Sequence, residues 1–170
     1  NVIASGNTKI GGQFELTNVH NKKISSKDFI TSPALIYFGY SYCPDICPYD
    51  LQRNVTAVDI LREKQITILP IFITIDPERD TPERLKDFSP FVHPNLLALT
   101  GSQFEITEVM KLFKVYGQMS NSESLDKNNY LMDHSAFTYL VDSSGNFLDY
   151  FNRQVSADEM ADKITCLIKS

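Results

Sequence analysis

Residues 33–48 read PALIYFGYSYCPDICP, an apolar run that leads directly into two cysteines. Positions 33–40 are apolar on both faces of an extended chain, as a strand buried inside a sheet is. Pro48 is a favoured first residue of a helix, and apolar side chains then recur at spacings of three and four. These residues predict a strand that ends just before the cysteines and a helix that begins just after them. The cysteines then lie at the carboxyl end of a sheet, where sites gather in open α/β folds.

Cys43 and Cys47 are four residues apart at this junction. Residues at that spacing on a helical turn bring their Cβ atoms within about 5–6 Å, so two sulfur atoms can hold one soft cation or close a disulfide. Copper, zinc and redox exchange are the three candidate chemistries. Burial of both cysteines as small hydrophobic side chains is the alternative. It is disfavoured because a proline directly follows each cysteine and keeps the stretch at a strand end.

The rest of the chain alternates between strand and helix patterns. Ser102 with Glu105, and Ser156 with Glu159, form two capping boxes that mark helix starts. The predicted elements are a hairpin with a strand at 11–17 and a turn at 18–23, a strand at 66–75, a helix that begins at Thr81-Pro82, a short strand at 96–99, a helix from 102 to about 116, a hairpin with strands at 135–141 and 147–151, and a closing helix from 156.

This order predicts an α/β fold, a thioredoxin-like sandwich with an added N-terminal hairpin and an inserted hairpin in the C-terminal half. Residues 1–170 are expected to form one such domain, because the length is close to the typical domain size of about 100–150 residues. The redox spacing typical of that fold is CxxC. Here three residues separate the cysteines, which favours a metal site without excluding a disulfide.

Composition limits the classes of partner. The net charge of −5 and the pI near 5.1 provide no basic stripe, so nucleic acid is not expected to bind. Three cysteines cannot close a disulfide framework, which indicates a site pair plus one spare. No apolar run approaches the roughly 20 residues that span a bilayer, and the chain starts at Asn1. We expect a processed or truncated soluble part whose N-terminal anchor or signal is missing.

Four stretches carry a resemblance to a known family: GQFEL at 12–16, FGY with CPDICP within 38–48, ITIDPERDTP at 73–82 and DHS at 133–135. They occur in order over nearly the whole chain. The CxxxCP and DPERDTP runs are specific together, whereas each alone is only moderately so. On these motifs the chain resembles the Sco proteins, named for synthesis of cytochrome c oxidase.

The resemblance implies a membrane-tethered copper metallochaperone with a thioredoxin-like fold. It implies that the soluble domain lies in the bacterial periplasm or the mitochondrial intermembrane space and helps to build the dinuclear copper centre of cytochrome c oxidase subunit II. Subunit II and other copper carriers are the implied partners. The family's metal ligands correspond here to Cys43, Cys47 and His134. Two thiolates and one imidazole suit both Cu(I) and Cu(II), and thiols must lose protons to bind, so affinity should fall in acid.

Other functions remain open from the residues alone. Cys43 and Cys47 could instead be the catalytic pair of a thiol-disulfide oxidoreductase or a redox sensor, so enzyme activity is undecided, and reduction of the target's cysteines is compatible with chaperone work. A peroxidase ranks last, because the chain has no tryptophan and lacks a Thr/Ser-x-x-Cys pattern. Structural zinc requires four protein ligands, and three are evident. The sequence does not predict the oligomeric state.

Asp76 ends the second predicted core strand and is expected to orient a metal ligand or a partner. The alternative is an aspartate that caps the turn to Pro77. Arg79 and Asp80 are expected to form a structural ion pair or a partner-facing surface.

The remaining candidate side chains are left out of the site. His20 and His93 are interpreted as ordinary surface imidazoles. Met119 and Met132 are interpreted as gap-filling side chains. Cys166 lies on the predicted last helix and is expected to pack inward, with a link between two chains as the alternative.

Overall fold

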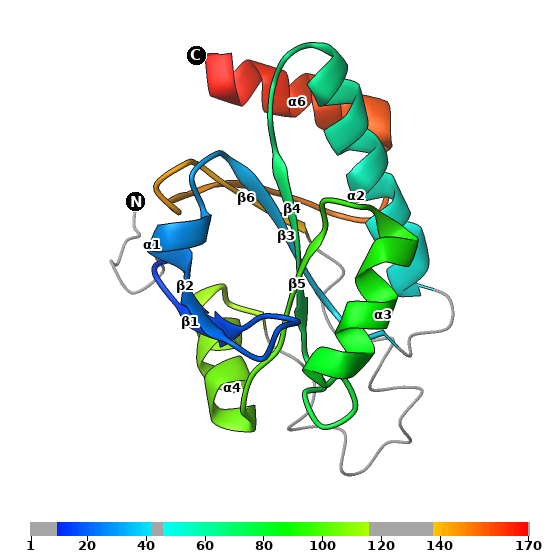
Figure 1. The fold of residues 1–170 in the computed structure, drawn as a ribbon. Coiled ribbons are helices and arrows are strands. Elements are labelled where there is room, and N and C mark those ends of the chain that lie inside the picture. The colour runs from blue at the N-terminus through cyan, green and yellow to red at the C-terminus, as the bar shows by residue number, and fades with distance from the viewer. Residues whose placement is uncertain (1–9, 42–45, 116–137, 170) are drawn as a thin grey trace.

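The computed structural model describes residues 10–41, 46–115 and 138–169, with 46–48 described by their backbone alone (Figure 1). The elements are β1 (Glu15–Thr17), β2 (Lys23–Ser25), α1 (Ser26–Phe29), β3 (Ala34–Gly39), α2 (Ile46–Glu63), β4 (Leu69–Thr74), α3 (Pro82–Val92), β5 (Leu97–Leu99), α4 (Gln103–Leu112), β6 (Thr138–Val141), β7 (Phe147–Phe151) and α6 (Ala157–Lys169). Among the described helices, none combines the length and hydrophobicity that a membrane span requires.

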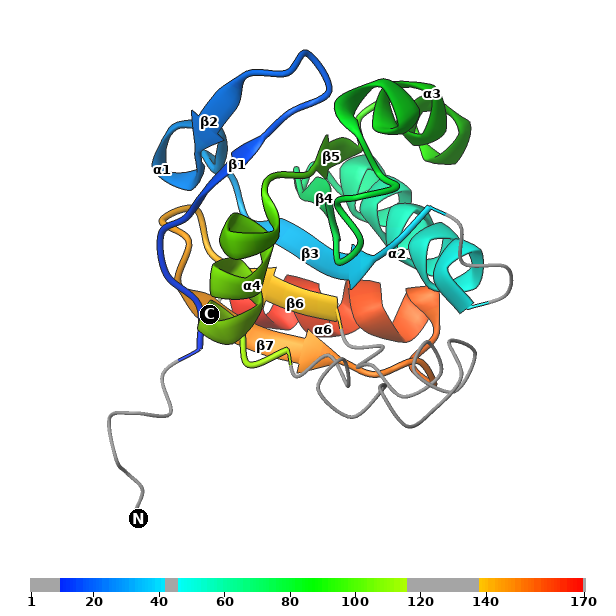
Figure 2. The same ribbon diagram turned by 90° about the horizontal axis from the view of Figure 1, so that it is seen from below.

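A five-stranded mixed sheet forms the centre, in the order β5-β4-β3-β6-β7. Strands β3, β4 and β5 are parallel, whereas β6 runs antiparallel to both of its neighbours (Figure 2). Gly39 pairs with Thr74, and Tyr37 pairs with Thr138. The carboxyl ends of β3 and β4 therefore meet the first residue of β6 at one edge of the sheet.

Alternate side chains of β3 enter two hydrophobic cores, because neighbouring residues of a strand point to opposite faces. Ile36 and Phe38 pack in the larger core with α4 and β1, whereas Leu35 packs with α2 and α6. Figure 1 shows the resulting layers, with α2 and α6 on one side of the sheet and α4 with the β1-β2 hairpin on the other. Helix α2 therefore covers the strand that leads to the cysteines.

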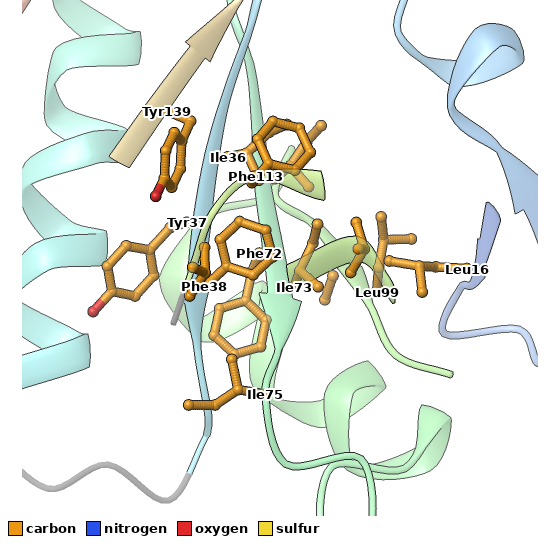
Figure 3. Close-up of a cluster of buried hydrophobic side chains, with 14 of the residues drawn as sticks. Leu16, Ile36, Tyr37, Phe38, Phe72, Ile73, Ile75, Leu99, Phe113 and Tyr139 are labelled. Atoms are coloured by element: carbon orange, nitrogen blue, oxygen red, sulfur yellow. The ribbon is translucent and has the colours of Figure 1, made fainter. Parts of the chain in front are cut away.

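Aromatic rings fill the larger core beside β3. The ring of Phe38 lies 5.7 Å from that of Phe113 and 5.9 Å from that of Tyr139, centroid to centroid. Tyr37 instead points away from these rings, toward a helix on the other face (Figure 3). This helix is α2, since the Tyr37 hydroxyl is bonded to its Asp50.

The N-terminal segment is bonded near both outermost strands of the five-stranded sheet, β7 and β5. Gly11 forms an isolated antiparallel bridge with Asn146, which lies beside β7, and Thr17 forms one with Thr100, which follows β5. The Thr17 N–H donates to the Thr100 carbonyl at 2.7 Å, and the Thr100 N–H donates back at 2.8 Å. The added hairpin is thus hydrogen-bonded to the main sheet.

The predicted thioredoxin-like α/β fold is confirmed, and most elements begin where their signals place them. Thr81 caps α3 by accepting a hydrogen bond from the Arg84 N–H. Both capping boxes are present, with reciprocal bonds between Ser102 and Glu105 and between the equivalent residues of α6. The C-terminal hairpin forms as β6 and β7 and supplies two strands of the main sheet.

Two local predictions were wrong, and one element was not predicted. Helix α2 begins at Ile46, which makes Pro48 its third residue rather than its first. Helix α4 ends at Leu112 instead of continuing to about 116, and Lys114 then adopts a left-handed φ of 59° that a helix cannot contain. The short helix α1 had no predicted counterpart.

Candidate metal centre

Of the three predicted ligands, only Cys47 belongs to the residues that the structure describes. Cys47 occupies the first turn of α2, as a backbone position. Cys43 and His134 lie outside the described residues, as do Met119 and Met132, so the ligand set stays a prediction. Within the ranges that are described, no three His, Cys, Asp or Glu side chains gather as a metal site.

Asp80 fixes the chain two residues before Cys43. Its fully buried carboxylate accepts hydrogen bonds from the Ser41 N–H at 2.9 Å, from the Ser41 hydroxyl and from the Thr74 hydroxyl at 2.7 Å. Arg84 Nε, in the first turn of α3, donates to Ser41 Oγ at 2.9 Å. A buried carboxylate is tolerated only with such partners. The expectation of a partner-facing surface at Asp80 was therefore wrong.

Asp76 organises the turn that follows β4. Its N–H donates to Thr74 Oγ1 at 2.9 Å, and its carbonyl accepts from the N–H groups of Arg79 and Asp80 at 3.2 and 3.0 Å. Its carboxylate pairs with Arg79, so Asp76 rather than Asp80 is the acid to which Arg79 donates. The turn-capping alternative is thus present, and a role for Asp76 in orienting a ligand stays a prediction.

Helix α2 carries an acidic group on its buried face, three positions after Cys47. Asp50 is only 4% exposed, and its carboxylate accepts a hydrogen bond from the Tyr37 hydroxyl at 3.0 Å. Arg153 Nε lies 3.6 Å from the other carboxylate oxygen. Burial raises the pKa of Asp50, while the Tyr37 hydrogen bond and the charges of Arg153 and Arg53 act in the opposite direction.

One turn further along, α2 is bonded to the start of β6. Asn54 is buried, and its side-chain amide donates to Thr138 Oγ1 at 2.9 Å. Arg53 donates to the carbonyls of Asn152, at 3.1 Å, and Val155, and its Nη2 lies 3.5 Å from Thr138 Oγ1. Burial lowers the pKa of Arg53, and Asp50 opposes the shift. The helix that carries Cys47 is therefore tied to the strand that follows His134.

The two predictions for the other histidines had different outcomes. His20 is exposed, as predicted. His93 is only 8% exposed, so its interpretation as a surface imidazole was wrong. Its Nδ1 accepts from the Asn95 N–H at 3.0 Å, which leaves Nε2 to donate to the Asp59 carboxylate at 2.9 Å. His93 thus joins the end of α3 to α2.

Cys166 is a free, exposed cysteine, so the prediction that it packs inward was wrong. The buried residues of α6 are Met160, Ala161 and Ile164. Position 166 lies two residues past Ile164, about 200° around the helix, and therefore faces solvent.

Sequence reasoning missed the groups that hold the site's surroundings. Ser41, Thr74 and Arg84 belong to the Asp80 network, and their partners are distant along the chain. A signal existed only for α2, where Asp50 and Asn54 flank the apolar positions of the buried face. Polar residues beside such a stripe indicate buried hydrogen bonds.

Comparison with known proteins supplies the family. Residues 3–169 match the sequence model of a family described as SCO1/SenC. A SCO2-like protein of Rickettsia prowazekii is 43% identical over 152 residues, which are 89% of this chain and 74% of that protein. A crystal structure of Arabidopsis thaliana ScoI with copper bound is 33% identical, has a TM-score of 0.85, and covers 94% of this chain and 98% of that one. For yeast Sco1 with copper bound the identity is 34%, the TM-score 0.80 and the shares 95% and 94%.

Proposed function

The chain belongs to the SCO1/SenC family, and from this we propose that it is a copper metallochaperone whose cargo ion is held by Cys43, Cys47 and His134. The observation that carries the proposal is the position of Cys47 in the first turn of α2, in a chain that shares its fold and a third of its residues with copper-bound ScoI.

Chain connectivity supports convergence of the three donors. Cys43 is four residues beyond Gly39, and His134 is four residues before Thr138. Four residues span at most about 14 Å. Both segments start from one edge of the sheet, because Tyr37 pairs with Thr138. The cysteine segment and the histidine segment are therefore within reach of each other.

The donor chemistry suits a cargo that is held and then released. Thiolates select Cu(I), and imidazole accommodates copper in either oxidation state. The helix dipole at the start of α2 favours the thiolate form of cysteines in its first turn. Because thiols release protons when they bind a metal, affinity falls as the pH is lowered.

The recipient is the dinuclear copper centre of cytochrome c oxidase subunit II, supplied directly or through other copper carriers. The domain works as the anchored, soluble part of a membrane protein in the bacterial periplasm or the mitochondrial intermembrane space. The Sco motifs at 38–48, 73–82 and 133–135 support this assignment.

A thiol-disulfide oxidoreductase is the second candidate. It is favoured by the placement of Cys47 at the N-terminus of the helix that follows β3 in a thioredoxin-like sheet. The same thiols can reduce a partner's cysteines and then deliver copper to them, so the two activities are compatible.

The test is titration of the reduced protein with Cu(I) and with Cu(II), in parallel with His134→Ala. We expect the parent to bind about one equivalent of either ion, as one site with two sulfurs and one nitrogen requires. The variant should lose Cu(II) first, because two thiolates still suffice for Cu(I). His20→Ala is the matched control, since His20 is an exposed imidazole that belongs to none of the four motifs.

Equal Cu(II) retention by His134→Ala and His20→Ala would remove the imidazole from the site. Rapid disulfide reduction by a protein that holds no stable copper would favour the oxidoreductase.

A further inference from the structure

The buried face of α2 includes polar side chains among the apolar ones that pack on the sheet. Asn54 is 3% exposed and Thr138 is fully buried. Each buried polar group costs free energy unless it is hydrogen-bonded. The Asn54 amide N–H donates to Thr138 Oγ1 at 2.9 Å, and the Asn54 amide oxygen accepts from Arg53 Nε at 2.8 Å. The bond is directional, so it fixes the position of α2 along β6 in a way that apolar contacts do not.

The bond joins the two elements from which proposed ligands extend. Asn54 lies seven positions after Cys47 on α2, which is about two turns or 10 Å along the same face. Thr138 is the first residue of β6 and follows His134 by four positions. A shift of α2 relative to β6 therefore changes the distance between the anchor of a thiolate and the anchor of the imidazole.

Neighbouring contacts make this link rigid. Arg53 reaches Thr138 Oγ1 at 3.5 Å and also bonds to the carbonyls of Asn152 and Val155, in the segment before α6. Helix α2 packs closely on α6, with which it shares a hydrophobic core. The Asn54–Thr138 hydrogen bond thus connects β6 to a helix that is itself held in place by Arg53 and by packing on α6.

We propose that Asn54 and Thr138 are positioning residues for the metal centre, because their hydrogen bond fixes α2, which carries Cys47, relative to β6, which follows His134 in the chain. This rests on the proposed function. Cu(II), which depends on the nitrogen ligand, is affected more than Cu(I), for which two sulfurs suffice.

The test removes the hydroxyl without changing side-chain volume, as Thr138→Val, and removes the donor separately, as Asn54→Ala. Each should weaken Cu(II) binding about tenfold, the lower end of the effect of groups that orient ligands, and change the electron paramagnetic resonance spectrum of bound Cu(II). Cu(I) affinity should change less. The double variant should lose little more than Asn54→Ala alone, because Asn54→Ala has already removed the bond that Thr138→Val removes.

Two controls separate positioning from a general loss of stability. Thr138→Ser keeps the hydroxyl and should behave like the parent. Thr100→Val makes the same substitution at a buried threonine whose hydroxyl has no hydrogen-bond partner among the described residues, and it should leave both affinities unchanged. Circular dichroism establishes that each variant is folded. If Thr138→Val does not fold, the Cu(II) affinity of Asn54→Ser, which shortens the donor side chain, is compared with that of Thr138→Ser, which keeps the hydroxyl. Only Asn54→Ser should then bind Cu(II) more weakly.

If His134→Ala loses Cu(II) while Thr138→Val and Asn54→Ala match the parent in affinity and spectrum, the positioning role is overturned and the ligand set stands. If His134→Ala also matches the parent, both are overturned. Parallel losses of Cu(I) and Cu(II) in Thr138→Val would also overturn the positioning role, because they indicate general destabilisation.

Discussion

At the residue scale, Asp80 explains why the DPERDTP motif accompanies the cysteines. Its carboxylate takes three hydrogen bonds from Ser41 and Thr74, and the next residue, Thr81, caps α3. One short motif thus holds the end of β3, the end of β4 and the start of a helix together.

We expect Asp80→Asn to lower the free energy of unfolding by about 1–3 kcal/mol, because an amide offers one acceptor oxygen where two are used and leaves buried donors unpaired. Urea denaturation followed by circular dichroism measures this. Asp28→Asn, at an exposed aspartate, is the control for loss of a negative charge. Equal effects of the two substitutions would contradict a specific role for the buried carboxylate.

The same residue shows where sequence reasoning reached its limit. The family motifs were readable because they lie in short runs. Asp80 was misread because its partner Ser41 is 39 positions away. His93 was misread for the same reason, since Asp59 lies on another helix. Burial and pairing across such separations depend on tertiary packing, which local patterns do not encode.

At the element scale, helix starts were predicted better than helix ends. Capping boxes and the Thr81-Pro82 start are local chemistry, and all three form as predicted. The end of α4 has no glycine or proline to mark it, and a lysine takes the left-handed position instead. The alternation of strand and helix patterns predicted the fold class, whereas the short helix α1 is too brief to leave a periodic signal.

Helix α2 also ends without a glycine or proline, and a glutamine takes the left-handed position that follows it. Gln65 is exposed, with a φ of 65°, and the Ile66 N–H donates back to the Leu61 carbonyl at 2.9 Å. Glycine is preferred at such a position because it has no Cβ to clash. We expect Gln65→Gly to raise the free energy of unfolding by about 1 kcal/mol.

Glu63→Gly, two residues earlier and still helical, is the matched control. It should lower the free energy of unfolding by about 1 kcal/mol. Urea denaturation of both variants measures the pair, and a decrease for Gln65→Gly as well would show that the left-handed backbone carries no strain.

At the scale of the whole molecule, one charged pair fastens the N-terminal hairpin to the rest of the chain. Lys23 Nζ on β2 lies 2.6 Å from Glu105 Oε2, in the first turn of α4. The hydrogen bond from Lys23, followed by the bond from the Ser102 N–H, lowers the pKa of Glu105 below its ordinary value of 4.5. The unfolded chain therefore binds this proton more readily than the folded one.

The sign of the pH dependence follows. The stabilisation from Glu105 is complete above the unfolded pKa and is lost as the pH falls through the lower folded pKa. We expect Glu105→Gln to cost about 0.5 kcal/mol near neutral pH, because glutamine can still act in a capping box and only a partly exposed charge pair is removed. The difference from the parent should disappear in acid.

Unfolding free energies measured from pH 7 to pH 3 test this, with the exposed Glu63→Gln as control. A difference that grows toward low pH would contradict the assignment.

The bridges at Gly11 and Thr17 have a consequence for behaviour at high concentration. An open sheet presents unpaired backbone groups along its outermost strands, which act as templates for strands of other chains. Here one short segment, tethered beside β7 at one end and beyond β5 at the other, occupies backbone groups near both margins. The N-terminal addition thereby leaves fewer unpaired backbone groups near these margins for a strand of another chain to pair with.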